Sequence, residues 1–246
     1  RALPNEKVRE AVVGLGTPAV PALIEALGDD ITVQLDLDLD DLFEQEQSVY
    51  DVRRLAAEAL GKLGDLQAVP ALSVWSHAGE DAARNALQKL GHPALELSQA
   101  VAQVAAQGAW GVLIRALPNE KVREAVVGLG TPAVPALIRA LGDRNENVRR
   151  AAAEALGAIG DPHAVPALSV QAHAGEDAAH NALQTLGHPA LELSQAVAQV
   201  AAQGAWGVLI RALPNEKVRE AVVGLGASAV PALIQALEDW DAGVRW

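Results

Sequence analysis

Side chains that could act as nucleophile, base and acid lie close together in the segment SHAGED, which contains Ser76, His77, Glu80 and Asp81. In a hydrolase the serine hydroxyl would attack the substrate after the histidine takes its proton. The segment recurs further along the chain, but Ala172 occupies the position of the serine there. Acidic residues in the first turn of a helix also have a simpler role, because they complement the positive end of the helix dipole. We therefore expect no catalytic residue here and no enzymatic activity.

Metal coordination is the second chemistry that the residue types allow. The histidines do not occur four residues apart, the spacing that places two imidazoles on one face of a helix, and the chain has no cysteine. Hard cations bind clustered carboxylates, and four aspartates form such a cluster, namely Asp36, Asp38, Asp40 and Asp41. Leucines occupy the intervening positions, and no glycine provides the sharp turn of an EF-hand loop. We expect no metal site and no cofactor, and these aspartates are the candidates should a cation bind.

The chain is built from tandem units. The sequence RALPNEKVREAVVGLG begins at Arg1, Arg115 and Arg211, with spacings of 114 and 96 residues. The difference of 18 is the length of the insert, residues 30–47, which the second unit lacks. The later halves of the units are nearly identical, which indicates recent duplication or engineering. We expect a single array over residues 1–246 that forms a window on a longer array.

A shorter helical pattern lies inside each unit. Apolar residues from Val8 to Leu15 recur at spacings of three, four and seven, which place them on one face of a helix. Gly16 can end that helix in a left-handed conformation, and Thr17 and Pro18 can begin the next one. The same order of glycine, cap and proline recurs along the chain. A hairpin this small cannot bury its apolar face alone, so the hairpins are predicted to stack as an α-solenoid.

Residues 145–170, NENVRRAAAEALGAIGDPHAVPALSV, resemble a HEAT-like repeat of the short bacterial kind that also occurs in phycobilin lyase subunits. Residues 51–72 are similar almost as closely, and the other modules more loosely. The segment 92–114 is longer than the pattern and predicts an extra or bent helix. The resemblance implies an all-α superhelix of stacked hairpins, with the acidic insert as an addition. It also implies that the second helices line a concave face that binds another protein.

Positions that differ between nearly identical modules indicate candidate contact residues. Glu25, Arg139 and Gln235 are equivalent, yet they differ in charge. They lie late in a second helix, and the resemblance places them in the groove of the solenoid; the alternative is that they are simply solvated. Trp75 corresponds to Gln171 in the next unit, so the repeat does not require an aromatic residue there. We predict that Trp75 is an exposed side chain that a partner contacts.

The insert Asp30–Gln47 contains five aspartates, two glutamates and no basic residue, so it supplies −7 of the net charge of −12. Its leucines alternate with polar residues as in a strand, but they also fit one face of a helix, so both conformations stay open. Leucines this dense are costly to expose to water, which favours docking against a partner or a second copy. The alternative is a solvated acidic loop. The docking residues would be Leu35, Leu37, Leu39 and Phe43.

The composition narrows the class of partner. The basic residues form no stripe, which argues against a nucleic-acid ligand, and no apolar run is long enough to span a membrane. We expect a cytoplasmic, soluble scaffold without catalytic activity that binds another protein or peptide on its concave face. Self-association through the insert stays open as a further possibility. The resemblance leaves open a bilin-lyase-like chaperone or enzyme subunit that cradles a pigment–protein substrate. The near-identical units, which lack cysteine and methionine, leave open an engineered repeat scaffold.

Overall fold

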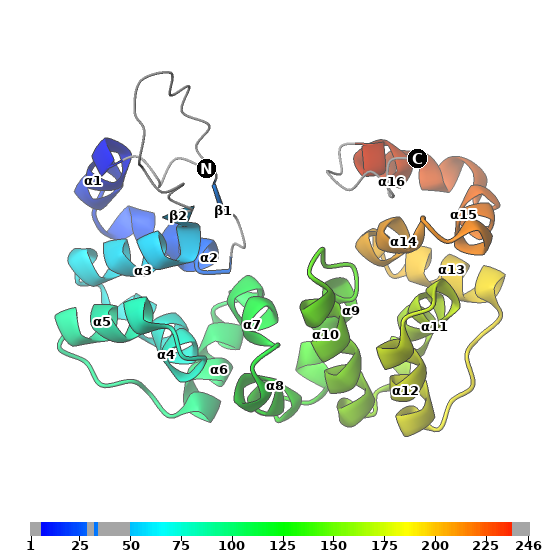
Figure 1. Ribbon diagram of the computed structural model, residues 1–246, viewed down its shortest axis with the longest axis horizontal. Coiled ribbons are helices and arrows are strands. Elements are labelled where there is room, and N and C mark those ends of the chain that lie inside the picture. Colours follow the sequence, from blue (N-terminus) through cyan, green and yellow to red (C-terminus); the bar gives the residue numbers. More distant parts are fainter. Residues whose placement is uncertain (1–5, 29–31, 34–49, 238–246) are drawn as a thin grey trace, which may run out of the picture. The chain divides into compact units, whose positions relative to one another are not determined.

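The computed structural model describes residues 6–28, 32–33 and 50–237 (Figure 1). Its contacts divide the chain into two compact units, Arg1–Ala125 and Val126–Trp246. Both units consist of paired helices, which confirms the predicted all-α fold of stacked hairpins. The single continuous array stays a prediction, and the two units are described separately below.

The first unit contains a series of short helices joined by tight turns. Its elements are α1 (Glu6–Gly14), η1 (Thr17–Ala19), α2 (Val20–Ala26), α3 (Val52–Leu63), η2 (Leu66–Ala68), α4 (Val69–His77), α5 (Asp81–Lys89), α6 (Leu97–Ala106) and α7 (Trp110–Ala116). Helix α8 (Glu120–Val127) contains the boundary between the units. Helix α3 packs on α2 and α5, and α4 packs on α5, α6 and α7. Each hairpin therefore covers the apolar face of its neighbour.

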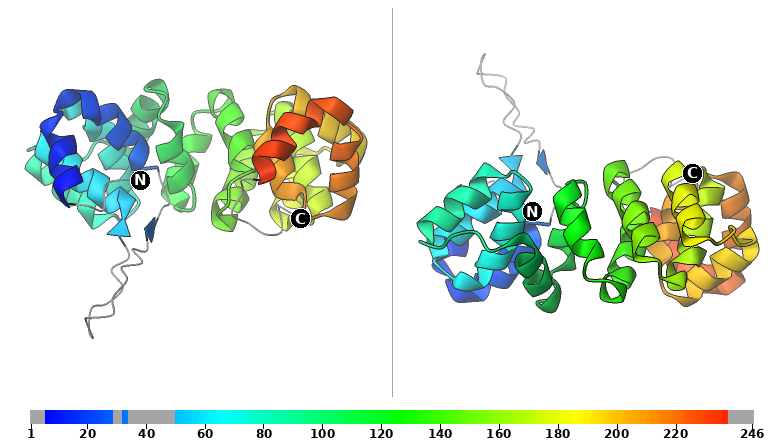
Figure 2. Two further views of the ribbon diagram at one scale, coloured as in Figure 1. Left: turned by 90° about the horizontal axis from the view of Figure 1, so that it is seen from above. Right: turned by 90° about the horizontal axis from the view of Figure 1, so that it is seen from below.

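The second unit repeats this arrangement. Its elements are η3 (Thr131–Ala133), α9 (Val134–Ala140), α10 (Glu146–Ile159), η4 (Pro162–Ala164), α11 (Val165–Ala174), α12 (Asp177–Leu186), α13 (Leu193–Ala202), α14 (Trp206–Ala212), α15 (Glu216–Val223), η5 (Gly226–Ala229) and α16 (Val230–Leu237). Helix α10 packs on α9 and α12, and α11 packs on α12, α13 and α14. Two further views show these helices following one another in chain order (Figure 2).

Two residues near the start of the acidic insert pair with two residues that follow its end. Strand β1 (Thr32–Val33) pairs antiparallel with strand β2 (Tyr50–Asp51), so that Thr32 is opposite Asp51. Residues 34–49, which hold the predicted docking leucines, lie outside the described part of the chain.

The hairpin turns follow the order of glycine, cap and proline. Gly160 ends α10 with a φ of 79°, a left-handed conformation that glycine adopts without strain. The carboxylate of Asp161 then accepts a hydrogen bond of 2.9 Å from the backbone N–H of His163, which caps η4. Pro162 occupies the first position of η4, where its missing N–H costs nothing. The order of glycine, cap and proline in the sequence therefore correctly predicts the boundary between α10 and η4.

An extra helix interrupts the hairpin pattern in both units. The long segment 92–114 forms α6 and then α7, with Gly108 in a left-handed conformation between them, which confirms the prediction of an extra or bent helix. Helix α14 is the counterpart of α7 in the second unit, and it packs against α9. Gly142 follows α9 and lies directly against the backbone of Gly207 in α14. Small residues at this crossing let two helices from different hairpins meet.

A buried serine fixes the extended segment that precedes α13. Ser169 is fully buried, and its hydroxyl donates to the carbonyl oxygen of Val165 at 2.7 Å. The Ser169 hydroxyl oxygen in turn accepts a hydrogen bond of 2.9 Å from the backbone N–H of Leu191. His173 adds a second connection, because its Nε2 lies 2.8 Å from the carbonyl oxygen of Leu191. Both backbone groups of Leu191 are therefore satisfied by side chains of α11.

We expect Ser169→Ala to lower the free energy of unfolding by about 1 to 3 kcal/mol, because the N–H of Leu191 loses its acceptor. Urea denaturation of the full chain measures this change. Ser194→Ala is the matched control, since Ser194 is exposed on α13. Equal unfolding midpoints for the two variants would contradict the assigned role of Ser169.

Candidate binding groove

The second unit contains a groove of about 620 Å³. Helix α9 forms one wall, the η4 turn borders it, and residues 203–205, between α13 and α14, form the opposite side. These three segments come together because α14 packs back against α9, across the hairpin that separates them in the sequence. The groove is therefore a consequence of the extra helix rather than of a single hairpin.

The walls of the groove are mainly aliphatic. Val134 and Ile138 contribute from α9, one turn apart, and Ala205 faces them from the start of α14. All three side chains are largely buried by the surrounding helices. Thr131 and Gln203 add polar groups at exposed positions of the lining. The groove thus combines an apolar interior with polar edges, as ligand sites commonly do.

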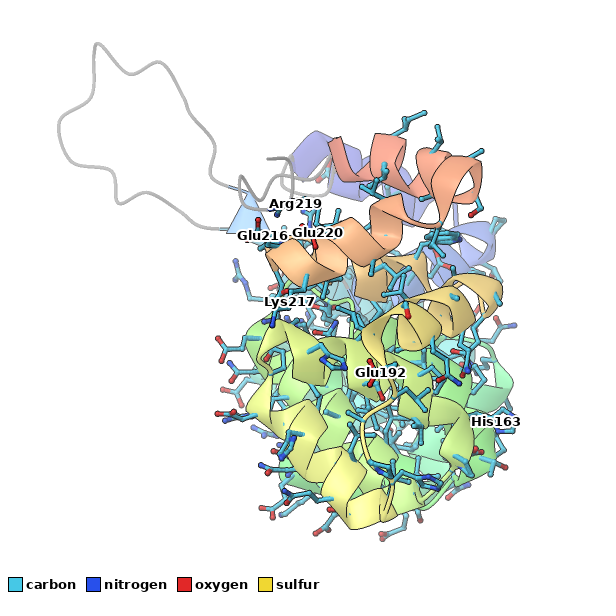
Figure 3. All side chains as sticks on the ribbon, turned by 90° about the vertical axis from the view of Figure 1, so that its right-hand side faces the viewer. His163, Glu192, Glu216, Lys217, Arg219 and Glu220 are labelled. Atoms are coloured by element: carbon cyan, nitrogen blue, oxygen red, sulfur yellow. The ribbon has the colours of Figure 1, made fainter. Side chains whose placement is uncertain are left out.

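Asp161 and His163 form the polar border at η4. The Asp161 carboxylate accepts the backbone N–H of His163 at 2.9 Å and lies 2.8 Å from Nδ1 of the imidazole. These hydrogen bonds stabilise the charged form and hold the pKa of the Asp161 carboxyl below its usual range. The His163 side chain is 83% exposed and lies at the surface of the unit (Figure 3). Gln203 donates to the carbonyl oxygen of His163 at 3.3 Å, which links the two sides of the groove.

A second hollow of about 390 Å³ adjoins the groove. His163 and Gln203 line both, so these two side chains stand between them. Pro166, His188 and Leu191 belong to the lining of the second hollow. A ligand longer than the groove could therefore continue past His163 along the same surface.

Arg139 supplies the positive charge of the groove. It is exposed on α9 and lines the groove. Its guanidinium makes no hydrogen bond or ion pair with the residues that the structure describes. Asp161, in contrast, already accepts two hydrogen bonds. Arg139 is therefore the charged group of this lining that is available to a ligand.

The repeats match known families in two places. A model of HEAT repeats matches residues 81–187, and a model of the PBS lyase HEAT-like repeat matches residues 52–73. The chain therefore contains HEAT-like repeats. A search among curated proteins finds no significant match. The α9 and η4 sides of the groove lie inside the matched HEAT repeats, and residues 203–205 follow them.

The structure describes two of the three equivalent positions that differ in charge between the HEAT-like units. Glu25 is exposed on α2, as Arg139 is on α9. Gln235 lies in α16, and its side chain is outside the described part. The structure thus places Arg139 in a groove, whereas partner contact by these three residues stays a prediction.

The prediction that Trp75 is exposed was wrong. Trp75 is only 3% exposed, and the guanidinium of Arg53 lies 4.2 Å from the centre of its ring. Its counterpart in the next HEAT-like unit, Gln171, is equally buried and donates from Nε2 to two carbonyl oxygens, those of Leu141 at 3.1 Å and Val208 at 3.3 Å. The two copies therefore fill the same buried position with different side chains, an indole in the first unit and a hydrogen-bonded amide in the second. A glutamine can be buried when its amide finds such acceptors.

The side chains of SHAGED have structural partners. His77 Nε2 lies 2.8 Å from the carbonyl oxygen of Leu95, as the equivalent histidine does in the second unit. Glu80 pairs with Arg53 at 3.3 Å, and Asp81 pairs with the arginine three residues later in α5. These contacts hold neighbouring segments of the HEAT-like hairpins together. They agree with the structural role that the sequence favours for the acidic residues.

The predicted docking and cation-binding residues of the insert fall outside the described residues. They are Leu35, Leu37, Leu39, Phe43, Asp36, Asp38, Asp40 and Asp41. In the part of the chain that the structure describes, there is no group of three or more His, Cys, Asp or Glu side chains placed to hold a metal ion. Nor is any helix among the described residues long and apolar enough to cross a membrane.

Proposed function

We propose that this HEAT-like repeat protein is a scaffold without catalytic activity and that the groove of the second unit holds a peptide segment of a partner protein. The observation that carries the proposal is an aliphatic groove with an arginine at its edge that has no partner among the described residues. Ligand sites typically have volumes of about 300 to 1,000 Å³, and the groove falls within this range. The net charge of −12 supports a protein partner rather than nucleic acid.

The lack of catalytic activity is part of the proposal. It is supported by His77 and Glu80, whose side chains are engaged with Leu95 and Arg53 rather than with a serine. Self-association through the acidic insert and a cytoplasmic location also belong to the proposal, and they rest on the composition of the sequence.

A second candidate function follows from the match of residues 52–73 to the PBS lyase HEAT-like repeat. In this alternative the chain cradles a pigment–protein substrate as a chaperone or enzyme subunit. Mixing the purified chain with a bilin and recording its absorbance spectrum tests this possibility. A shifted absorption band would support it, and an unchanged spectrum would favour the scaffold.

Selection from a random peptide display library on the full chain should enrich peptides that occupy the groove. Thr131→Trp should abolish their binding, because Thr131 is an exposed lining residue and the indole would fill the groove. Ala158→Trp is the matched control, since Ala158 is exposed on α10 and does not line the groove. Enriched peptides that bind both variants equally, or the absence of any enriched peptide, would contradict the proposed site.

A further inference from the structure

We infer that the groove of the second unit selects an acidic, aliphatic segment of a partner protein, in which a carboxylate lies next to leucine-like side chains. This inference rests on the proposed function and specifies its ligand. The occupant would lie extended between α9 and the turn at residues 203–205, with its carboxylate on the guanidinium of Arg139.

The charge of the ligand follows from the two ionised groups of the lining. The carboxylate of Asp161 points toward the η4 turn that it caps. There it is only 12% exposed and is hydrogen-bonded to His163. Arg139 is exposed and has no partner among the described residues. A carboxylate of the ligand would give Arg139 a charge-assisted hydrogen bond. A basic ligand would leave its own charge unpaired beside this arginine.

The aliphatic walls determine which side chains accompany the carboxylate. Pro135, which is exposed on α9, presents apolar surface to the groove, together with the small uncovered parts of Val134, Ile138 and Ala205. Leucine, isoleucine or valine of the ligand would displace water from this surface, which is favourable in proportion to the apolar area that is buried. The polar groups of Gln203 and Thr131 are positioned at its edges and can bond the ligand backbone. An alternation of leucine and aspartate satisfies both requirements.

The first unit provides an internal comparison. Eight of the ten residues that line the groove have an identical counterpart in the first unit. The two that differ are Arg139, replaced by Glu25, and His163, replaced by Gln67. The copies thus keep the aliphatic lining and reverse the charge at one position. Charge reversal on a shared scaffold is a direct means of separating ligands, because like charges repel.

The chain as a whole is acidic, with a net charge of −12, so attraction for an acidic peptide has to be local. Seven of those charges belong to the insert at residues 30–47 and not to the second unit. The selectivity therefore depends on one side chain, Arg139, and a single substitution is expected to remove it.

The test uses the full chain and two fluorescein-labelled synthetic peptides, GLDLDLG and its neutral analogue GLNLNLG. Fluorescence anisotropy should show about tenfold tighter binding of the acidic peptide, the size expected when a favourable ion pair is combined with a good apolar fit. Arg139→Glu, which installs the residue of the first unit, should weaken binding of the acidic peptide by tenfold or more and leave the neutral peptide nearly unaffected. Glu25→Arg is the matched control and should not weaken binding to the second unit.

The outcomes separate the inference from the proposed function. If both peptides bind equally, and Thr131→Trp still blocks them, the groove binds peptides without charge selection and the inference is wrong while the proposed function stands. If neither peptide binds, the inference is wrong, and library selection decides the proposed function. Circular dichroism of Arg139→Glu should match the parent chain, which separates lost binding from lost folding.

A second copy of the chain is the competing occupant, because its insert is itself rich in alternating leucine and aspartate. Sedimentation velocity of the full chain identifies it. Self-association that is lost both with Arg139→Glu and when Asp29 is joined to Ser48 would assign the groove to the insert of another copy. That result would overturn the inference of a separate partner. Binding of GLDLDLG that depends on Arg139, with self-association unchanged by Arg139→Glu, supports the inference.

Discussion

Trp75→Ala should lower the free energy of unfolding by about 3 to 5 kcal/mol, the range typical of removing a buried aromatic side chain. Trp75 is 3% exposed at the end of α4, and its ring lies beneath the guanidinium of Arg53. The substitution removes both the apolar contacts and the cation–π interaction. Thermal and urea unfolding of the full chain measure the loss.

Trp75→Gln is the variant to compare with Trp75→Ala, because it installs the residue of the second unit. The indole Nε1 of Trp75 is buried without a hydrogen-bond partner among the described residues. A glutamine at this position can instead copy Gln171, whose amide bonds two backbone carbonyls in the second unit. We therefore expect Trp75→Gln to destabilise the chain by less than half as much as Trp75→Ala. If both variants lose the same free energy of unfolding, a glutamine at position 75 does not find the hydrogen bonds that Gln171 makes in the second unit.

Gly142→Ala should lower the free energy of unfolding by about 3 kcal/mol, at the upper end of typical overpacking costs. A Cβ atom at Gly142 would lie 2.6 Å from the carbonyl oxygen of Gly207 and 2.7 Å from the backbone nitrogen of Val208. Because these are backbone atoms, α9 and α14 would have to separate. The groove between them would change with that movement, so the variant should also lose peptide binding.

Gly207→Ala is the control on the other side of the same crossing. A Cβ atom at Gly207 would lie 4.0 Å from the Cα of Gly142, which is ordinary van der Waals contact. Alanine also favours a helix over glycine by about 1 kcal/mol, so this variant should be as stable as the parent chain or slightly more stable. Similar destabilisation by both substitutions would contradict the close approach of the two helices.

The hairpins could be predicted from the sequence because their determinants are local. The order of glycine, cap and proline around Asp161 specifies where one helix ends and the next begins. The length of the segment 92–114 predicts the additional helix. What this local pattern does not contain is the packing of α14 against α9, which joins residues from different hairpins. The groove depends on that packing and so could not be derived from helical periodicity.

The comparison between copies leads to different kinds of position for two residues. Variation at Arg139 points to a position that lines the groove, whereas variation at Trp75 concerns a buried junction. Sequence variation reports only that two side chains can be accommodated, and a buried site can accommodate both when each finds partners. The same comparison pairs His163 with Gln67, a difference that could have indicated the η4 border of the groove in advance.

Hydrogen–deuterium exchange of the full chain, with and without the peptide GLDLDLG, tests the central claim most directly. Exchange reports local protection of backbone amides, so it locates a ligand without relying on a substitution. The groove predicts slower exchange in residues 131–140 and 199–206 when the peptide is present, with α12 (Asp177–Leu186) unchanged as an internal reference. Protection confined to α12, or no protection at all at a peptide concentration that saturates binding, would contradict the assignment of this groove as the peptide site.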